Sequence, residues 1–557
     1  MLNLTIGIGP PATKPPHAGL PAFVPLDQEG QPATLALDLA NDRGWYNGKS
    51  YGSLSALLAV SAGTRIGDAY EFGPVFGAEE WLTNGHFDSD VSGWTSGRSA
   101  TIAAVGGECQ FTGGGGSLGY FIQSVSGRRG RCARLTVSGR RGSSTNSFLG
   151  GGGGDATVNF LNGGATSAQI TSTATSTITG LLNITDDPAG IGVRNTSSAG
   201  AGTAYFDNLS LVEAHPFETW PGLDFSIVLS GTVPSLGSSP QVLIQGDNDD
   251  SGQKHLWRVI LDIDGVFKFN YRNNSSVGSV LELGSVAVGQ PFRLAIGISR
   301  TAQSASLDGK PVVSLSATMP GTGKLRVGKG YGTTNSLPHA ALTGASVVSG
   351  RQPNTWLQYA ASGFSSAAIW TNGDSYTDGA YGVALASSLR NLTGRIVIND
   401  AVGGSTLRAA RDRLVAAPHA RRKPLVIWDG SANGYGSVEE TLAIVDEIVA
   451  WHGDAKRIII VPSVSVGPSS SIAVSSYTSD MEAIRDGIIA RGLWPAGAEF
   501  DPTARLNAIA AGSAQDLIDM SARVVCQSLL NDQVHLKQAA MDVVTGLVAS
   551  TLSARGI

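Results

Sequence analysis

Between residues 353 and 557, short apolar runs alternate along the chain with amphipathic stretches. The runs are almost continuously apolar, which is typical of parallel strands that are buried on both faces of a sheet. They cover 368–372, 395–398, 424–428 and 457–461. Helices are expected at 438–452, 480–491 and 536–553, because their apolar residues recur on one stripe. This alternation predicts a doubly wound, flavodoxin-like α/β domain over 353–557.

Upstream of this domain the pattern changes to short alternating strands separated by Gly, Ser and Thr turns, which predicts two β-sandwich modules. The first covers 81–214 and includes a strand at 133–137. The second covers 215–352, with strands at 225–229, 255–261 and 292–298. Asp264-Gly265 and Asp308-Gly309 are strong hairpin turns of this second module.

Short motifs connect both modules with known sandwich families. The first opens with Asn-Gly-His-Phe at 84–87 and Gly93-Trp94, closes with Phe-Asp-Asn-Leu-Ser-Leu at 206–211, and resembles carbohydrate-binding jelly-roll modules. The second contains Phe-Arg-Leu-Ala-Ile-Gly at 292–297 and Ser-Leu-Asp-Gly-Lys at 306–310, and resembles concanavalin-like (laminin-G-like) sandwiches. These resemblances imply glycan binding, although such sandwiches also serve as inert spacers.

Residues 1–80 open with repeated prolines, which favours an extended arm. A hairpin signal follows at 45–49, then a short helix at 53–59 with Ser53 as its candidate N-cap. Its Trp-Tyr-Asn-Gly and Ser-Leu-Ser-Ala-Leu-Leu runs resemble the N-terminal attachment regions of phage and prophage tail proteins. An irregular packing arm is the alternative interpretation.

Composition narrows the function classes. A chain of 557 residues is too long for one core, and 73 glycines with 15% charged residues favour β-rich modules with tight turns. The formal net charge of -5 and the absence of a dense Lys/Arg stripe argue against nucleic-acid binding. No apolar run is long enough to span a membrane, and the N-terminus carries no secretory signal pattern.

Neither cysteines nor metals are expected to hold this fold together. The three cysteines are Cys109, Cys132 and Cys526. Buried thiols are favoured over a Cys109–Cys132 pair, and no Cys-x-x-Cys suggests zinc. The group Asp247, Asp249 and Asp250 has the oxygen ligands that calcium uses, but an acidic surface turn is favoured. No metal or cofactor is therefore predicted.

Candidate chemistry lies where the predicted strands of the last domain end. The triplet Gly373-Asp374-Ser375 directly follows the first strand, at the sheet edge where ligands gather in open α/β sheets. Three later blocks occupy similar boundaries: 399–406, 429–434 and 531–535. A serine hydroxyl becomes a nucleophile only when a base takes its proton, and the imidazole of His535 is the kind of group that can act as that base. Asp532, three residues earlier, can orient that imidazole, whereas His419 and His452 have no acid at this spacing.

The four blocks, in this order over about 360–557, resemble the SGNH (GDSL-type) hydrolases. The resemblance implies Ser375 as nucleophile and, as oxyanion donors, the backbone N–H groups of Ser375 and Gly404 and the side-chain amide of Asn433. The third block departs from the family's Gly-x-Asn-Asp: 430–434 reads Gly-Ser-Ala-Asn-Gly, with one more residue and no acid. Taken singly, each of these residues also has a structural explanation. Ser375 could be a turn serine, Gly404 a helix-start glycine, Asn433 a loop cap and His535 a cap of the last helix.

Together the blocks predict a serine esterase that removes acyl groups, O-acetyl above all, from a polysaccharide. Candidate substrate-binding residues are Asp374, Tyr376, Trp428 and Tyr435, although core packing explains the aromatic ones equally well. The alternatives are a non-catalytic glycan-binding adhesin on a hydrolase scaffold and a lipase or thioesterase. With a tail-like N-terminus, a phage tail component that is made in the host cytoplasm and acts at the bacterial surface is expected. Its expected partners are an acetylated polysaccharide and other tail proteins; a homotrimer is compatible, although no heptad repeat enforces one.

Overall fold

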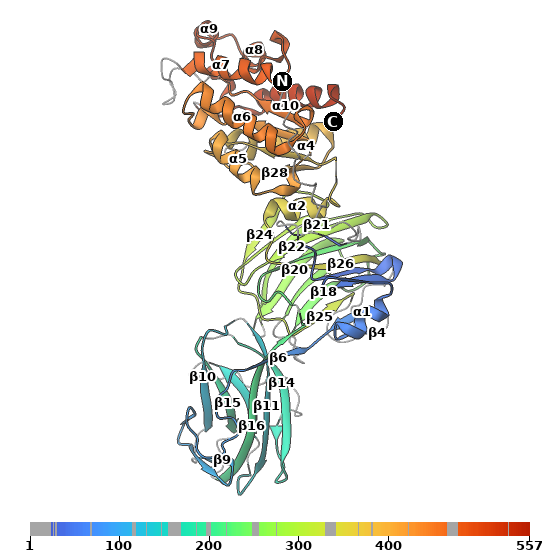
Figure 1. The fold of residues 1–557 in the computed structure, drawn as a ribbon, viewed down its shortest axis with the longest axis vertical. Coiled ribbons are helices and arrows are strands. Elements are labelled where there is room, and N and C mark those ends of the chain that lie inside the picture. The colour runs from blue at the N-terminus through green and yellow to red at the C-terminus, as the bar shows by residue number, and fades with distance from the viewer. Residues whose placement is uncertain are drawn as a thin grey trace, which may run out of the picture.

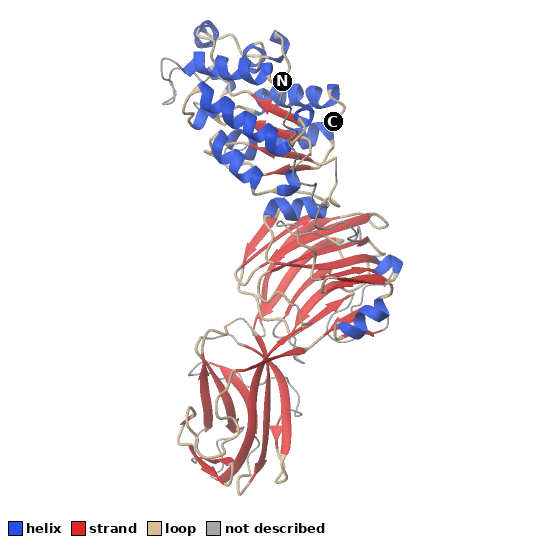
Figure 2. Cartoon of the chain, viewed as in Figure 1, coloured by secondary structure: helices blue, strands red, loops and turns tan. Residues whose placement is uncertain are grey.

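The computed structural model describes residues 24–25, 27, 31–66, 69–113, 119–129, 131–145, 148–153, 169–184, 187–195, 202–218, 220–247, 256–273, 276–328, 341–365, 367–379, 383–421, 423–464, 477–532 and 534–557. They form three units along the long axis of the molecule (Figure 1). A helix-rich unit lies at one end, a large sandwich in the middle and a smaller sandwich at the other end (Figure 2).

The middle sandwich consists of an eight-stranded and a seven-stranded antiparallel sheet. In spatial order, the first contains β24 (Val313–Ser316), β23 (Ala302–Leu307), β22 (Pro291–Ile298), β17 (Phe225–Thr232), β26 (Leu342–Ser349), β1 (Leu35–Asp38), β2 (Arg43–Tyr46) and β3 (Lys49–Tyr51). The second contains β21 (Ser276–Ser285), β20 (Val266–Asn273), β19 (Leu256–Leu261), β18 (Gln241–Asp247), β25 (Lys324–Val327), β5 (Ala69–Phe72) and β4 (Gly63–Ile66). Their alternating apolar residues meet in one core, with Trp257, Phe267 and Phe292 buried at its centre.

Part of the predicted N-terminal segment belongs to this sandwich. Strand β1 pairs with β26, with Leu35 opposite Val347, and β5 pairs with β25, with Phe72 opposite Leu325. The prediction of a separate attachment segment over 1–80 is therefore wrong for 35–72, because buried partners far along the chain complete these strands. The local predictions are confirmed: Asn47-Gly48 turns the hairpin, and the Ser53 hydroxyl caps α1 (Leu54–Val60). Residues 1–23 lie outside the described part of the chain.

The smaller sandwich is an insertion between β5 and β17 of the middle one (Figure 1). One sheet contains β13 (Gln169–Ile170), β12 (Phe148–Gly153), β15 (Ala189–Asn195), β10 (Tyr120–Val125) and β7 (Thr95–Gly97). The other contains β14 (Ser176–Asn183), β11 (Cys132–Arg141), β16 (Gly202–His215), β9 (Glu108–Gly113) and β8 (Thr101–Val105), and β6 (Val75–Glu80) also pairs with β16. Its core is a cluster of buried rings that includes Phe111, Phe121, Phe148 and Phe206.

The cysteines behave as expected and one acidic residue does not. Cys109, Cys132 and Cys526 are buried, and none of the three forms a disulfide with another described cysteine. Asp247, expected in an acidic surface turn, is buried on β18 and forms an ion pair with Arg326, Nε to Oδ2 3.1 Å. The expectation was wrong here because a paired carboxylate can be buried where a lone one cannot. Asp249 and Asp250 lie outside the described residues.

The C-terminal unit is built on a four-stranded parallel sheet, in the order β28 (Val397–Asn399), β27 (Ile369–Asn372), β29 (Leu425–Trp428) and β30 (Ile458–Val461). The chain starts in the second position, steps to the edge and then crosses back, which is the doubly wound order. Right-handed connections then place helices on both faces. The helices are α3 (Ser375–Asp378), α4 (Leu385–Thr393), α5 (Leu407–Val415), α6 (Val438–His452), α7 (Tyr477–Ala490), α8 (Pro502–Asn507), α9 (Ala514–Ser521) and α10 (Gln538–Ala554).

Helix α2 (Asn354–Ala361) joins this unit to the middle sandwich. Its Trp356 and Leu357 pack on the outer face of the eight-stranded sheet, in a small core of their own. Gln358 Nε2 donates to Gly309 O of the sandwich and to Val397 O of β28, both at 2.9 Å. The edge of the parallel sheet is therefore anchored on the sandwich.

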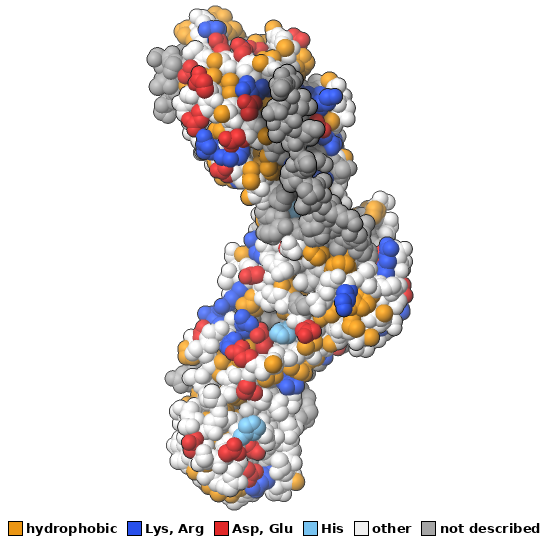
Figure 3. All heavy atoms as spheres, in the orientation of Figure 1, with side chains coloured by type: hydrophobic (Ala, Val, Ile, Leu, Met, Phe, Trp, Pro, Cys, Tyr) orange, Lys and Arg blue, Asp and Glu red, His pale blue; other side chains and the backbone are white. Residues whose placement is uncertain are grey.

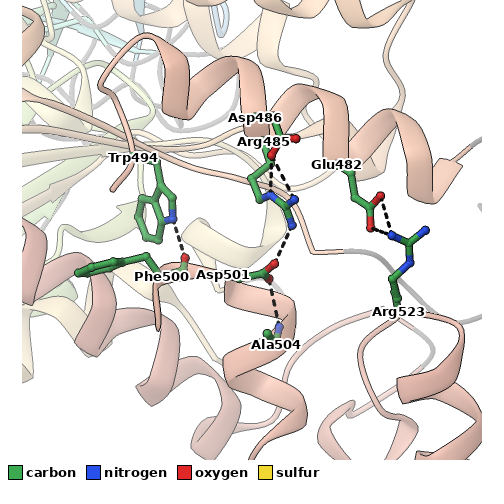
Figure 4. Close-up of polar contacts among 8 residues, drawn as sticks. All are labelled: Glu482, Arg485, Asp486, Trp494, Phe500, Asp501, Ala504 and Arg523. Carbon is green, nitrogen blue, oxygen red and sulfur yellow. Dashed lines mark hydrogen bonds and ion pairs between the residues drawn. The ribbon is translucent and has the colours of Figure 1, made fainter. Parts of the chain in front are cut away.

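Ion pairs fix the region that precedes the last helix (Figure 4). Arg485 of α7 bonds Asp501, Nη1 to Oδ2 2.6 Å, and Asp501 caps α8 by accepting from Ala504 N. Glu482 of the same helix pairs with Arg523, at 2.8 Å. On the face shown in Figure 3, acidic and basic side chains are interspersed over all three units. No helix among the described residues is long and apolar enough to cross a membrane.

Candidate active site

The turn after β27 presents Ser375 at the carboxyl edge of the parallel sheet. Gly373 has φ +135°, and a Cβ there would lie 2.9 Å from Trp428 O and 3.0 Å from Trp428 Cβ. Only glycine fits this approach between two strands. Asp374 then caps α3, its carboxylate accepting from Tyr376 N at 3.0 Å. Ser375 is the first residue of that helix, and only 6% of its surface is exposed to solvent.

Ser375, His535 and Asp532 form one chain of hydrogen bonds. His535 Nε2 lies 3.0 Å from Ser375 Oγ, and His535 Nδ1 lies 2.7 Å from Asp532 Oδ2. Asp532 Oδ1 also accepts from the backbone N–H groups of Val534 and His535, at 2.7 and 2.6 Å. Burial alone would raise the pKa of Asp532, but these hydrogen bonds outweigh it and lower the pKa. An ionised Asp532 requires a proton on Nδ1, which leaves Nε2 to accept from the serine hydroxyl.

Tyr376 and Trp428 pack beside the residues of this hydrogen-bond chain and hold them in place. Their rings stack at 4.6 Å and 5°, and the Tyr376 hydroxyl donates to Val534 O at 2.7 Å, beside His535. Tyr376 is 2% exposed and Trp428 is fully buried, so neither can line a sugar platform as predicted. The prediction failed because closeness along the chain does not say which way a ring faces. Both rings instead hold the loop that carries Asp532 and His535 (the histidine loop) against the turn at 373–375 (the nucleophile turn).

The loop after β28 supplies further donors. Asp400 N donates to Thr371 O at 2.9 Å and Val402 N to Gly373 O at 3.3 Å, so the loop lies along the nucleophile turn. Gly404 sits in it with φ +75° and open space around its Cα. Among the described residues, the backbone N–H groups of Ser375 and Gly404 have no hydrogen-bond partner. Two unused N–H groups at such an edge can donate hydrogen bonds to a developing oxyanion.

Asn433, in the unusual third block, reaches the site but is already engaged. It ends the short 3-10 turn η5 (Ser431–Asn433), and its Nδ2 donates to Asp374 Oδ2 at 3.0 Å and to Ser405 O at 3.2 Å. Both amide hydrogens therefore bind protein acceptors. In this geometry Asn433 links the nucleophile turn to the Gly404 loop, and a role as oxyanion donor would require one of these bonds to be exchanged.

Buried carboxyl groups follow three of the four strands. Burial, with a contribution from Asp429, raises the pKa of Asp374 to about 7. Burial also raises the pKa of Asp400 to about 6 and that of Asp429. Asp429 accepts from Ser431 N at 3.0 Å and from Ser463 N at 2.9 Å, which fixes the third block. Asp374 has no exposed surface, so its predicted contact with substrate is wrong.

Two clefts are lined in part by residues of the site blocks, and Ser375 itself lines neither of them. One, of about 430 Å³, is lined by Asp378 and Gly379 at the end of α3, by Ser387 and Arg390 of α4, and by Val312 of the middle sandwich. The other, of about 340 Å³, lies beside the third block and is lined by Tyr435. The Tyr435 hydroxyl donates to Asp480 at 2.6 Å. Of the three aromatic residues proposed for substrate contact, Tyr435 is the one that lines a cleft.

Sequence reasoning missed Arg413, which contacts both the nucleophile turn and the Gly404 loop. Its position was a usable signal: it follows Ala410 by three residues and precedes Leu414, so it falls on the buried face of α5. Within the described parts of the chain, no three His, Cys, Asp or Glu side chains are grouped so that they could hold a metal ion.

Loss of the Asn433 amide should weaken the site without unfolding it. We expect Asn433→Ala to lower kcat about 10- to 100-fold, because Asp374 and the Gly404 loop lose their common donor. Ester hydrolysis and the melting temperature of the full chain measure this. Asn391→Ala, at an exposed position of α4, is the control. An unchanged kcat would remove Asn433 from the site.

No protein-family model matches the chain, and no curated protein matches it in sequence. Solved structures give partial likenesses. A lipolytic protein of the G-D-S-L family from Desulfitobacterium hafniense is 15% identical, with 33% of this chain and 99% of that chain covered and a TM-score of 0.25. The CBM40 module of the Ruminococcus gnavus IT-sialidase, bound to α2,3-sialyllactose, is 14% identical, with 25% and 83% covered and a TM-score of 0.23. The leech intramolecular trans-sialidase is 14% identical, with 25% of this chain and 23% of that chain covered and a TM-score of 0.22. Identities and TM-scores this low assign no function, so the function is inferred below from the geometry of the site.

Proposed function

We propose that this chain is a serine esterase that removes acyl groups, O-acetyl above all, from a polysaccharide. The observation that carries the proposal is the pair of contacts at His535, 3.0 Å to Ser375 Oγ and 2.7 Å to Asp532 Oδ2. A serine, an imidazole and a carboxylate in this order are the parts that nucleophilic acyl transfer needs. Two unused N–H donors beside the serine add the oxyanion stabilisation.

The proposed reaction has two halves. His535 Nε2 takes the hydroxyl proton as Ser375 Oγ attacks the acyl carbon, and the carbonyl oxygen becomes an oxyanion held by the N–H groups of Ser375 and Gly404. Collapse breaks the ester bond, and the proton on His535 goes to the departing sugar oxygen. Water then attacks the acyl-enzyme with His535 again as base, which releases the carboxylic acid and restores Ser375.

A polysaccharide is favoured as substrate by the architecture around the site. The 430 Å³ cleft beside α3 includes Pro311 and Val312 of the middle sandwich, so a long substrate could contact both units. Its other lining groups include Asn354, Ser387 and Asn399, which can hydrogen-bond sugar hydroxyls. These groups support a glycan as the substrate. The proposed role as a phage tail component at the bacterial surface rests on the sequence motifs at 45–48 and 53–58 alone, and those motifs lie within the middle sandwich.

A fluorophosphonate probe and an acetate assay test the proposal. We expect the full chain to gain one phosphonyl group, located on Ser375 by peptide mass spectrometry. We also expect it to release acetate from an O-acetylated polysaccharide, and not from the same polysaccharide after alkaline deacetylation. Ser387→Ala, which removes a hydroxyl from the neighbouring cleft, is the control and should label normally.

Other outcomes would point to the alternative functions. A chain that binds the acetylated glycan but is neither labelled nor active would be an adhesin on a hydrolase scaffold. Hydrolysis that increases steeply with acyl chain length and ignores the glycan would indicate a lipase or thioesterase. Either result would overturn the polysaccharide esterase.

A further inference from the structure

Arg413, on helix α5, makes four hydrogen bonds beneath the candidate active site. Its Nη2 donates to Asn372 Oδ1 and to Gly373 O, both at 2.8 Å. Its Nη1 donates to Ser405 Oγ at 2.9 Å, and its Nε to Asp400 O at 3.0 Å. All three guanidinium nitrogens are therefore used, two bonds going to the nucleophile turn and two to the Gly404 loop.

These contacts connect the two segments that carry the unused donors. Gly373 is two residues before Ser375, and Ser405 directly follows Gly404. Among the described residues, the direct backbone bond from the Gly404 loop to Gly373 O is the long one from Val402 N, at 3.3 Å. A planar guanidinium with five N–H groups in fixed directions can hold several acceptors at set positions, which a lysine ammonium cannot do.

The surroundings of Arg413 differ from those of the other arginines on the same helix. Arg408 pairs with Glu440 at 2.7 Å and Arg411 with Glu447 at 3.0 Å, the first pair exposed and the second half-buried. Arg413 makes no direct ion pair among the described residues, and its four acceptors are neutral oxygens. Burial lowers its pKa, which the neighbouring Asp400 partly opposes. An arginine nevertheless stays charged at neutral pH, so a fixed cation lies behind the two donors.

We propose that Arg413 is a positioning residue that holds the N–H groups of Ser375 and Gly404 at the separation that the oxyanion of the tetrahedral intermediate requires. This role rests on the proposed esterase function. Arg413 does not touch the substrate. It acts through the Gly373 and Asp400 carbonyl groups, the Asn372 amide and the Ser405 hydroxyl, and its charge favours the negative oxygen as that oxygen develops.

Steady-state kinetics on p-nitrophenyl acetate, with the full chain, test the role. We expect Arg413→Gln to lower kcat about 100-fold with KM within about twofold, since substrate binding does not use the oxyanion hole. Arg413→Lys should lose about tenfold, because one ammonium reaches fewer of the four acceptors. In Arg413→Ala, added methylguanidine should restore part of kcat. Arg411→Gln, on the same helix and paired with Glu447, is the matched control and should keep full activity.

Melting temperatures separate positioning from folding. The proposal is overturned if Arg413→Gln keeps the wild-type kcat. It is also overturned if the activity lost in each variant merely equals the folded protein lost and methylguanidine restores nothing. Arg413→Lys keeps the test decisive should the shorter side chains fail to fold. A wild-type chain no more active than Ser375→Ala would instead contradict the esterase itself, so the two failures are distinguishable.

Discussion

Replacing Ser375 by alanine is expected to lower kcat/KM for ester hydrolysis by about 10⁵-fold, to the activity that the oxyanion donors give without a nucleophile. His535→Ala should lose about as much, because the serine hydroxyl does not attack without a base. The double variant should be no worse than either single one, since the two residues act in one step and their effects are not additive. Additive losses would mean that His535 serves another step.

Folding should not change with these substitutions. Ser375 is 6% exposed, and among the described residues the hydrogen bond of its hydroxyl is the one to His535, which folding does not require. Melting temperatures of the full chain should therefore stay within about 2 °C, a shift that corresponds to about 0.5–1 kcal/mol for a unit of this size. A Ser375→Ala protein that still released acetate at the wild-type rate would contradict the mechanism.

The order of the site blocks could be predicted from the sequence because each follows an apolar strand or precedes a helix. The carboxyl ends of parallel strands meet at one edge, so Ser375, Gly404 and Asn433 had to lie near one another once the sheet was assigned. The bond from His535 to Asp532 is equally local, since three residues separate them. Local spacing and strand order carry these predictions.

Side-chain direction and distant pairing could not be predicted in the same way. Asp374, Tyr376 and Trp428 are adjacent to the catalytic blocks along the chain, but the structure turns all three into the core. Arg413 was overlooked because arginines on amphipathic helices are usually exposed. Strand β1 pairs with β26 some 300 residues later. Because the smaller sandwich is inserted between these strands in the sequence, 35–72 were predicted to be a separate segment.

The connection between the units gives the fold a functional logic. Gln358 bonds the middle sandwich and the edge strand β28 with one amide, and the cleft beside α3 is lined by both units. The sheet edge that carries the candidate active site is thus fixed relative to the sandwich, and the two units are not joined by a flexible linker alone. Under the proposed function, a substrate that contacts both units through this cleft would have a fixed direction relative to the sheet edge that carries Ser375.

Gly373→Ala is expected to damage activity and stability together. A Cβ at φ +135° is strained by about 1–3 kcal/mol, and it would also press on Trp428 O and Cβ at 2.9 and 3.0 Å. Trp428 is fully buried against Tyr376, so it cannot move away without disturbing the histidine loop. We expect kcat to fall at least about 100-fold, since a shift of about 1 Å at the nucleophile costs that much. The free energy of unfolding should fall by about 2–4 kcal/mol.

Gly546→Ala is the matched control, because this glycine lies inside helix α10 and an added methyl group would meet no other atom within 4 Å. It should keep full activity and gain about 0.5–1 kcal/mol from the better helix former. Urea unfolding followed by tryptophan fluorescence, beside kcat on p-nitrophenyl acetate, measures both effects. If Gly373→Ala lost stability but kept its kcat, the nucleophile turn would tolerate movement, and the rigid placement of Ser375 against His535 would not be what limits catalysis.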